Sequence, residues 1–360
     1  MKNKITCILF AIFLLSVSFV CIFFPEDEFS ESERRALEKF PEVSGETLIS
    51  GEFSGNFEKY ATDRFPFRDT FRSIKAYASS YVFQKTDNNE VISEGGHLSK
   101  LDYPLSPDMQ KIASERFGFI YESFIKGKTD KIYLSIVPDK NYYMDTLKYD
   151  YEKLAETMRE GMPYAEYIDL FPKLSLSDYY TTDSHWKQER ITGVAQTIAS
   201  KMNVKIDAKY AVNTYPEPFY GVYVGQSALK ASPDTIKYVT NDILENCKVL
   251  DYNSGMAKPS FMYHSEKAEG RDMYEMFLGG NSPLITIENP GASEKRELVI
   301  FRDSFASSLA PLLVPGYSKI TLVDIRYMQS SLVGNFVDFE DSDVLFLYSS
   351  SLLNTASAFK

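Results

Sequence analysis

The sequence is poor in cysteine, histidine and tryptophan, and this limits the kinds of site that it can build. Its 360 residues include three cysteines, three histidines and one tryptophan. Cys7 and Cys21 fall inside an apolar N-terminal run, so Cys247 stands alone in the remainder and no disulfide can form there. No cysteines and histidines have the spacing of zinc ligands, and we expect no metal and no other cofactor. The alternative is a metal bound by all three histidines, but nothing in the sequence places these histidines close to one another.

The chain is also short of positive charge. Lysine and arginine number 39 against 50 acidic residues, which gives a net charge of −11 and an isoelectric point near 5.0. No basic patch with interleaved aromatic residues is present, and nucleic acid is therefore excluded as a partner. The sequence has no glycine-rich phosphate loop, internal repeat or low-complexity tract either. Hydrophobic content of 44% is ordinary and is sufficient for a globular core.

A single long apolar run occupies the N-terminus, from Ile5 to Phe24. As a helix it would measure about 30 Å, the thickness of a bilayer core. Lys2 and Lys4 precede the run and acidic residues follow it, so the positive-inside rule leaves the N-terminus cytoplasmic and the remainder extracytoplasmic. We therefore predict a transmembrane signal anchor over residues 1–25 and a single-pass protein of the cell membrane.

Two alternatives exist for this N-terminus. Ser16 to Ser18 forms an acceptable cleavage site for a signal peptide, but the apolar run continues well past it, which favours the uncleaved anchor. A lipoprotein attached through Cys21 is disfavoured, because Val20 stands where a small residue is expected.

Residues 26–90 are predicted to form a helical neck. Ser30 and Glu33 have capping-box spacing, which predicts a charged helix that begins after Ser30 and ends near Pro41. Between residues 45 and 84 aromatic residues recur every three or four positions, which is typical of amphipathic helices.

From residue 91 to 360 the pattern indicates one α/β domain. Helices are expected over 109–127, 151–161, 186–202, 306–313 and 327–333, and strands over 131–137, 165–170, 298–301, 319–324 and 344–348. This alternation predicts a parallel sheet with right-handed crossovers, whose chemistry gathers at the carboxyl ends of the strands. Residues 205–295 show no clean period and are interpreted as a loop-rich insertion with short strands.

Two stretches have the residue types of a nucleophilic triad. Ser304 stands between a predicted strand and a predicted helix, which is the context of a nucleophile elbow, although a Gly-x-Ser-x-Gly frame is missing. In YYTTDSHW, Asp183 lies two residues before His185, so the carboxylate can orient the imidazole if the segment is extended. The alternatives are a plain helix cap at Asp303-Ser304 and, for His185, simple packing before the next helix.

A third stretch, FLGGN, is a candidate for stabilising an oxyanion. The Gly280 amide and the Asn281 side chain could donate to developing negative charge, although a tight turn is the commoner explanation for such a sequence. Arg302 and Tyr180, which belong to the same motifs as the triad residues, complete the candidates for oxyanion or substrate binding.

The chain resembles the DHHW family of Gram-positive bacteria and, more distantly, the SGNH-like proteins of alginate O-acetylation. The resemblance extends over nearly the whole chain and rests on ordered landmarks: SERRALEKFP, SGEFSGNFEKYATDRFPFRD, IVPDK, YYTTDSHW, FYGVYVGQSAL, MFLGGN, FRDSFASSLAPLL and VDIRY. One departure is Ser184, which occupies the first histidine position of Asp-His-His-Trp.

The resemblance implies an SGNH-like, flavodoxin-type three-layer sandwich with catalytic Asp183, His185 and Ser304. In ordinary SGNH hydrolases the serine comes first, so the order here is permuted. It further implies an O-acyltransferase or acetylesterase that acts on an envelope or exported polysaccharide, with a membrane-bound O-acyltransferase as the partner that supplies acyl groups. The alternative is a non-catalytic glycan-binding or scaffold protein of the same system.

Overall fold

The computed structural model describes residues 2–23, 28–30, 32–270 and 272–360, which form two compact units. The first comprises residues 1–91 and 222–230, and the second residues 92–221 and 231–360. The division after residue 91 lies next to the predicted boundary after residue 90. The return of residues 222–230 to the first unit is not indicated by any sequence pattern.

The first unit consists mainly of helices. These are α1 (Lys2–Phe23), α2 (Gly45–Ser50), α3 (Glu52–Asp63), α4 (Arg68–Tyr77), the π-helical turn Ala78–Val82 and α8 (Val222–Ser227). The helix predicted after Ser30 is wrong: β1 (Phe29–Ser30) and β2 (Arg35–Ala36) pair antiparallel instead. The Glu33 N–H still donates to Ser30 Oγ at 3.2 Å, but within a turn that carries Glu33 to Arg68 and Arg72.

The predicted anchor coincides with α1, whose described side chains, from Lys4 to Ser16 and at Phe19, are exposed. Within the ranges that the structure describes, no helix has both the length and the apolar character required to cross a membrane. Residues 24 and 25 of the predicted anchor lie outside the described residues, and the membrane location stays a prediction.

The second unit is built on an eight-stranded sheet in the order β11-β10-β12-β14-β13-β15-β6-β7. Five neighbouring strands are parallel: β14 (Lys319–Val323), β13 (Glu297–Arg302), β15 (Asp343–Ser349), β6 (Ile132–Val137) and β7 (Glu166–Asp169). β12 (Leu284–Glu288), β10 (Lys248–Asp251) and β11 (Lys258–Ser260) extend the sheet antiparallel. The prediction of a parallel sheet is therefore correct for its centre, while three short strands of the loop-rich insertion make the whole sheet mixed.

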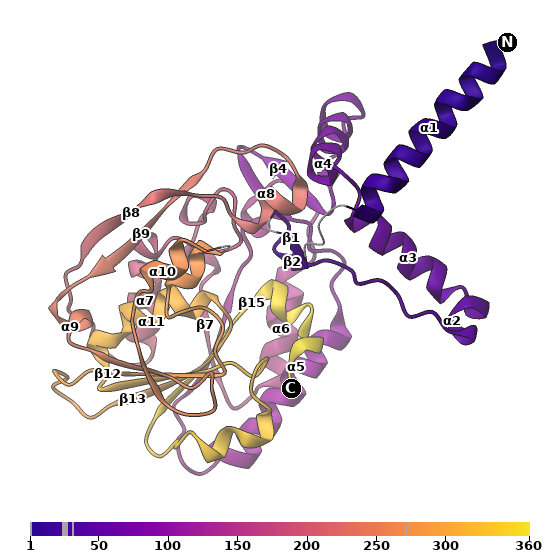
Figure 1. Ribbon diagram of the computed structural model, residues 1–360. Coiled ribbons are helices and arrows are strands. Elements are labelled where there is room, and N and C mark those ends of the chain that lie inside the picture. Colours follow the sequence, from indigo (N-terminus) through magenta and orange to yellow (C-terminus); the bar gives the residue numbers. More distant parts are fainter. Residues whose placement is uncertain (1, 24–27, 31, 271) are drawn as a thin grey trace. The chain divides into compact units, whose positions relative to one another are not determined.

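Helices cover both faces of this sheet (Figure 1). Along β13, Leu298 and Ile300 pack with α7 (Thr192–Lys201) and α11 (Phe305–Leu313), whereas Val299 and Phe301 pack with α5 (Pro107–Ile120) and α6 (Tyr151–Gly161). The alternation follows from the two-residue period of a strand that is buried on both faces. The result is a layered α/β unit in which the carboxyl ends of β13, β15, β6 and β7 share one edge.

The other elements lie around this core. Residues 87–100 form short strands β3 (Asp87–Asn88), β4 (Val91–Glu94) and β5 (His97–Lys100), and β8 (Ala211–Phe219) pairs antiparallel with β9 (Asp234–Thr240). Short helices are α9 (Asp242–Glu245), α10 (Ser265–Ala268) and α12 (Ser350–Leu353). The helix predicted over 327–333 is wrong; residues Ser330–Asn335 form a 3-10 turn after the Asp324 carbonyl accepts the N–H groups of residues 327 and 328.

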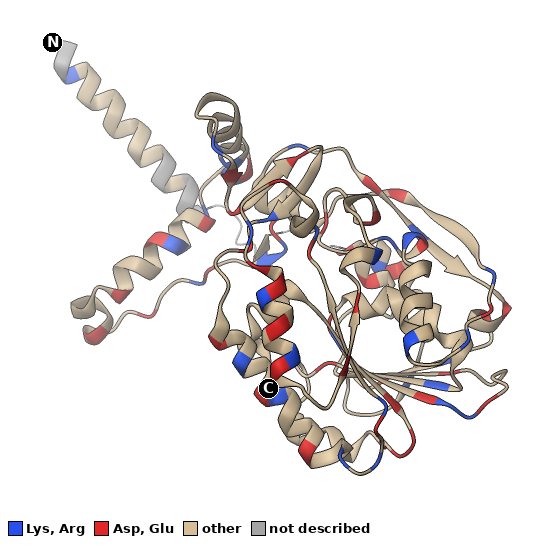
Figure 2. Ribbon diagram, turned by 180° about the vertical axis from the view of Figure 1, so that it is seen from behind, with Lys and Arg blue, Asp and Glu red and all other residues tan. Residues whose placement is uncertain are grey.

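Charged residues of both signs are interspersed along the ribbon, as Figure 2 shows. Many pair locally, for example Lys126 with Glu122 and Lys153 with Glu156. The net acidity of the chain is thus spread out, with positive residues distributed among negative ones.

Candidate active site

Ser304 lies at the turn between β13 and α11, as the sequence predicts. Its backbone is already helical, and the preceding Asp303 holds the turn: Asp303 Oδ1 accepts the Phe305 N–H at 3.0 Å and Oδ2 accepts the Ser349 N–H at 2.7 Å. Among the described residues the Ser304 hydroxyl makes no capping hydrogen bond to α11. Of the helix cap expected as the alternative at Asp303-Ser304, Asp303 supplies the hydrogen bond to α11, and the Ser304 hydroxyl remains available for other contacts.

The structure brings Asp183, His185 and Ser304 into one hydrogen-bonded chain. His185 Nε2 lies 2.7 Å from Ser304 Oγ, and His185 Nδ1 lies 2.6 Å from Asp183 Oδ1. The Asp183 side chain is 2% exposed and that of His185 12% exposed, whereas Ser304 is partly exposed. A buried carboxylate, an imidazole and an accessible hydroxyl in this order can activate the hydroxyl as a nucleophile.

The Asp183–His185 segment is a closed loop and not the extended strand that the spacing suggested. Tyr179 and Trp186 bridge antiparallel at its base, and the Tyr180 N–H donates to the His185 carbonyl at 3.0 Å. The loop therefore turns back on itself, which lets two residues so close in sequence direct the carboxylate onto Nδ1.

Two buried charged residues hold this loop through hydrogen bonds. Lys140 Nζ donates to the carbonyls of Tyr180, Thr181 and Asp183 at 3.0, 3.1 and 2.7 Å. The Asp234 carboxylate accepts four hydrogen bonds from the N–H and hydroxyl groups of Thr181 and Thr182. Burial lowers the pKa of Lys140 to about 7, while the nearby carboxylates of Asp183 and Asp234 oppose that shift.

The His185 ring is positioned by aromatic packing. Tyr274 stacks on it with centroids 3.8 Å apart and planes 9° from parallel, and Phe305 packs beside it at 5.0 Å. The Tyr274 hydroxyl lies 2.7 Å from Ser308 Oγ, one turn beyond Ser304 on α11. The same helix carries Ser304 and binds Tyr274, which stacks on His185. These contacts therefore fix the position of the imidazole relative to the serine.

Trp186 also contacts helix α11, and it does not begin a helix itself. The helix predicted from Trp186 starts only at Thr192, after a 3-10 turn at Gln188–Arg190. The Trp186 indole N–H lies 3.2 Å from the Phe305 carbonyl and 2.9 Å from Ser308 Oγ. The single tryptophan thus links the histidine loop to the nucleophile helix.

Of the residues predicted to bind the oxyanion, Gly280 lies in a turn whose residues have positive φ angles. Leu278, Gly279 and Gly280 have φ of 57°, 75° and 85°, and a Cβ on Gly280 would lie 2.7 Å from Glu275 Cγ, so glycine is required there. The Gly280 N–H donates weakly to the Phe277 carbonyl at 3.4 Å, and Asn281 is exposed. Oxyanion binding by Gly280 and Asn281 stays a prediction.

Arg302 and Tyr180 are both buried, which argues against direct contact with substrate. Arg302 donates to Ser307 Oγ at 2.7 Å and, more weakly, to the carbonyls of Gly280 and Ser282. The Tyr180 ring packs edge-on against Phe219 and Tyr274, and burial raises the pKa of its hydroxyl. Arg302 therefore ties the FLGGN turn to α11, and Tyr180 supports the ring that stacks on His185.

The other two histidines stand apart from the triad in their contacts. His264 contacts Ser260 and Glu266, and burial lowers the pKa of His97. Within the described part of the chain, no three side chains among His, Cys, Asp and Glu form a group able to hold a metal ion.

Four positioning residues were not predicted from the sequence: Lys140, Asp234, Tyr274 and Ser308. Lys140 falls in the IVPDK landmark, and that landmark was the only signal for it. Asp234 and Tyr274 come from the region without a clear period, where nothing local marks them.

The fold and the site define an α/β protein with a large, mostly parallel sheet, at whose carboxyl edge a Ser-His-Asp hydrogen-bonded chain lies. No protein-family model matches the sequence, and no curated protein matches it. Solved structures do match. A DHHW family protein from Eubacterium siraeum aligns with a TM-score of 0.58 at 17% identity, over 76% of this chain and 97% of that one.

Bacillus cereus PatB1, in a structure with a sulfonyl adduct, also aligns with a TM-score of 0.58, at 19% identity over 73% of this chain and 95% of its own. The O-acetyltransferase domain of Pseudomonas putida AlgJ matches with a TM-score of 0.42 at 12% identity, over 73% and 92% of the two chains. The resemblance to the DHHW family is thus confirmed at the level of the fold by the Eubacterium siraeum structure.

Proposed function

We propose that this chain is an acyl-transfer enzyme in which Ser304 is the nucleophile, His185 the general base and Asp183 the residue that orients His185. The observation that carries the proposal is the 2.7 Å contact between His185 Nε2 and Ser304 Oγ, formed across 119 residues of sequence. A chance contact of two polar side chains would not also include a buried carboxylate on the other imidazole nitrogen.

The reaction would proceed in two steps. Ser304 Oγ attacks the acyl carbonyl carbon while His185 Nε2 takes the hydroxyl proton, and Asp183 stabilises the imidazolium through Nδ1–H. The bond to the leaving alcohol then breaks, His185 returns the proton to that alcohol, and an acyl ester remains on Ser304. In the second step His185 deprotonates a sugar hydroxyl or water, which attacks the acyl carbon and releases Ser304. The amino-terminal end of α11 favours the negative charge of each tetrahedral intermediate.

The substrate in this proposal is a polysaccharide of the cell envelope or one that is exported, which either accepts the acyl group on a sugar hydroxyl or carries the acetyl ester that is hydrolysed. Support comes from the sequence resemblance to the DHHW and alginate O-acetylation proteins. On the same basis the acyl groups would come from a membrane-bound O-acyltransferase, with residues 1–25 anchoring the chain in the cell membrane and the second unit outside the cytoplasm.

A non-catalytic glycan-binding or scaffold protein is the competing function. It would not need the imidazole to reach the serine, and a separation well beyond hydrogen-bonding distance would favour it. The 2.7 Å contact favours catalysis.

Replacement of the nucleophile tests the chemistry. We expect Ser304→Ala to lower turnover of p-nitrophenyl acetate by roughly 10³-fold or more, because the variant cannot form an acyl ester on residue 304. A sulfonyl fluoride should attach to Ser304 in the wild type and not in the variant. Ser357→Ala, at an exposed serine near the C-terminus, is the matched control and should leave turnover unchanged.

Unchanged turnover in a folded Ser304→Ala protein would contradict the proposal. The substrate is tested separately, by mass analysis of envelope polysaccharide from a strain that lacks the protein. Unaltered acetylation there, together with an active triad in vitro, would reject the polysaccharide and retain the acyl-transfer chemistry.

A further inference from the structure

Helix α4 carries a basic stripe and an apolar stripe side by side. Arg68, Arg72 and Lys75 recur at intervals of four and three residues and share one face, and Phe67 at the N-cap, Phe71 and Ile74 share the adjoining face. A helix on the surface of a protein in water normally turns such an apolar stripe inward and its charges outward.

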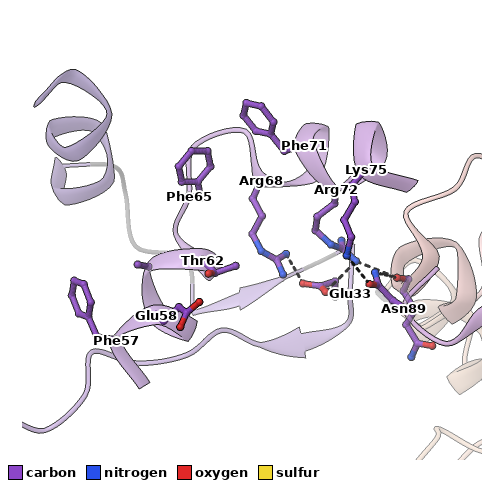
Figure 3. Close-up of a pocket in the computed structure, with 12 residues that line it drawn as sticks. Glu33, Phe57, Glu58, Thr62, Phe65, Arg68, Phe71, Arg72, Lys75 and Asn89 are labelled. Carbon is purple, nitrogen blue, oxygen red and sulfur yellow. Dashed lines mark hydrogen bonds and ion pairs between the residues drawn. The ribbon is translucent and has the colours of Figure 1, made fainter. Parts of the chain in front are cut away.

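The structure turns the two arginines of the basic stripe inward, while Lys75 is exposed. The side chains of Arg68 and Arg72 are only 16% and 14% exposed, and both contact Glu33, at 2.5 and 3.1 Å. Arg72 also donates to the Gly225 carbonyl at 2.8 Å. Figure 3 shows the guanidinium groups directed toward Glu33, whereas the Phe65 and Phe71 rings point away from it.

The apolar stripe is left outside. Phe67 is 73% exposed, Phe71 54% and Ile74 58%. Next to the stripe is a cavity of about 980 Å³, with Phe57, Phe65 and Phe71 among its walls. Turning the charges inward and the rings outward is unfavourable in water, so it indicates that the outer face normally meets an apolar surrounding.

The exposed apolar surface extends well beyond α4. Large apolar side chains that are exposed recur along residues 40–83 of the same unit: Phe40, Val43, Leu48, Ile49, Phe57, Phe65, Phe67, Phe71, Ile74, Tyr77, Tyr81, Val82 and Phe83. They come from α2, α3, α4, the π-helical turn and the segments that flank these elements, and several are aromatic. Phenylalanine and tyrosine suit a membrane interface, where an apolar ring meets hydrocarbon and a polar group meets water.

We propose that the apolar stripe of α4, defined by Phe67, Phe71 and Ile74, docks onto a lipid bilayer and lies in its interfacial plane. A bilayer fits better than a protein partner because the apolar groups are spread over several helices, and a fluid surface covers them without needing a complementary shape. Glu33 already neutralises the inward-facing arginines, so docking relies on the apolar groups and does not depend on anionic headgroups. The inference is independent of the acyl-transfer chemistry.

Site-specific fluorescence on the full chain tests this docking. Cys7, Cys21 and Cys247 are replaced by serine, and a single cysteine is introduced by Phe71→Cys or Ile74→Cys and labelled with an environment-sensitive nitrobenzoxadiazole dye. With phosphatidylcholine vesicles we expect a blue shift of the emission and quenching by doxyl-labelled lipids, both retained at high salt.

Asp69→Cys is the matched control on the same helix. Its side chain is 64% exposed and lies on the face opposite the apolar stripe, so its label should remain in water. Lys205→Cys in the second unit, where the lysine is 87% exposed, serves as a second aqueous control. These positions are all exposed, and circular dichroism verifies that each labelled protein is folded.

Any of three results would overturn the proposal. In one, the labels at 71 and 74 keep the emission that they have in buffer, or respond no more than the label at 69. In another, they become shielded as protein concentration rises without lipid, which would assign the stripe to contact between copies of the chain. A response that is lost at high salt would likewise contradict docking through apolar groups.

Discussion

Lys140 is the residue on which the geometry of the histidine loop most depends. Its Nζ has one proton for each of the three carbonyls that it meets, and it is 1% exposed. A buried ammonium group is tolerated only because these acceptors replace its water. The same contacts fix the carbonyl of Asp183, the residue that orients the catalytic imidazole.

The low pKa of Lys140 predicts how stability depends on pH. The folded chain releases this proton near pH 7, whereas the unfolded chain holds it to about pH 10.4. Between these values the unfolded state binds more protons, so raising the pH stabilises the fold, by about 1.4 kcal/mol per pH unit at most. Urea unfolding at pH 7, 8 and 9 should show the stability of the wild type rising relative to Lys140→Met.

Lys153→Met is the control, since Lys153 is an exposed lysine on α6. A stability difference between wild type and Lys140→Met that stays constant with pH would mean that the ammonium remains charged throughout. Lys140→Met should in addition lower kcat, because a displaced Asp183 misaligns the base.

At the scale of elements, the site depends on close contact between segments that are distant in sequence. Gly221 follows β8, in the FYGVY landmark, and lies against the Asp183 loop; its N–H donates to Thr182 Oγ1 at 2.9 Å. A Cβ at this position would overlap Asp183 Cβ and the backbone of Thr182. The glycine is required here by the close approach.

We therefore expect Gly221→Ala to displace Asp183 and to lower kcat by roughly 10²-fold, the effect of about 1 Å of misplacement at a catalytic group. The unfolding free energy should fall by about 1–3 kcal/mol from overpacking. Steady-state kinetics with p-nitrophenyl acetate and urea unfolding measure the two effects. Gly118→Ala on α5, where an added Cβ meets nothing within 4 Å, should leave both nearly unchanged. Wild-type kinetics in a folded Gly221→Ala protein would show that the loop tolerates the shift.

At the scale of the whole molecule, the proposed catalytic residues and helix α4 belong to different units. Asp183, His185 and Ser304 all belong to the second unit, and Glu33, Arg68 and Arg72 belong to the first. Glu33 shares its carboxylate among Arg35, Arg68 and Arg72, and is the centre of the first unit's polar interior.

This division predicts that Glu33→Gln weakens the first unit without stopping the chemistry. Loss of the carboxylate removes its contacts with three guanidinium groups, although Arg35 and Arg68 keep Asp63 as a partner. Charged hydrogen bonds of this kind contribute about 2 kcal/mol each. Limited proteolysis should cut residues 28–90 faster than in the wild type, while p-nitrophenyl acetate turnover is retained. Glu58→Gln, at an exposed position on α3, is the control. A loss of turnover as large as that of Ser304→Ala would show that the units are coupled.

Much of the second unit's centre could be predicted from sequence. β6, β13, β14 and β15 and helices α6 and α11 begin and end within about two residues of their predicted positions. Buried parallel strands are continuous apolar runs, and their signal is local. β10, β11 and β12 could not be recognised as part of the sheet, because strands of only three to five residues leave no periodic pattern.

The sequence by itself determined which residue types are available: a single Asp-x-His pair, a serine after a buried strand and an apolar N-terminus. Only the tertiary structure decided that His185 reaches Ser304, that Lys140 and Asp234 hold the loop, and that α4 turns its arginines inward. The physical reason is the distance along the sequence over which each kind of interaction acts. Hydrophobic period and capping act over a few residues, whereas a hydrogen bond across 119 residues, or the choice of face that a helix buries, is set by what the rest of the chain packs against it.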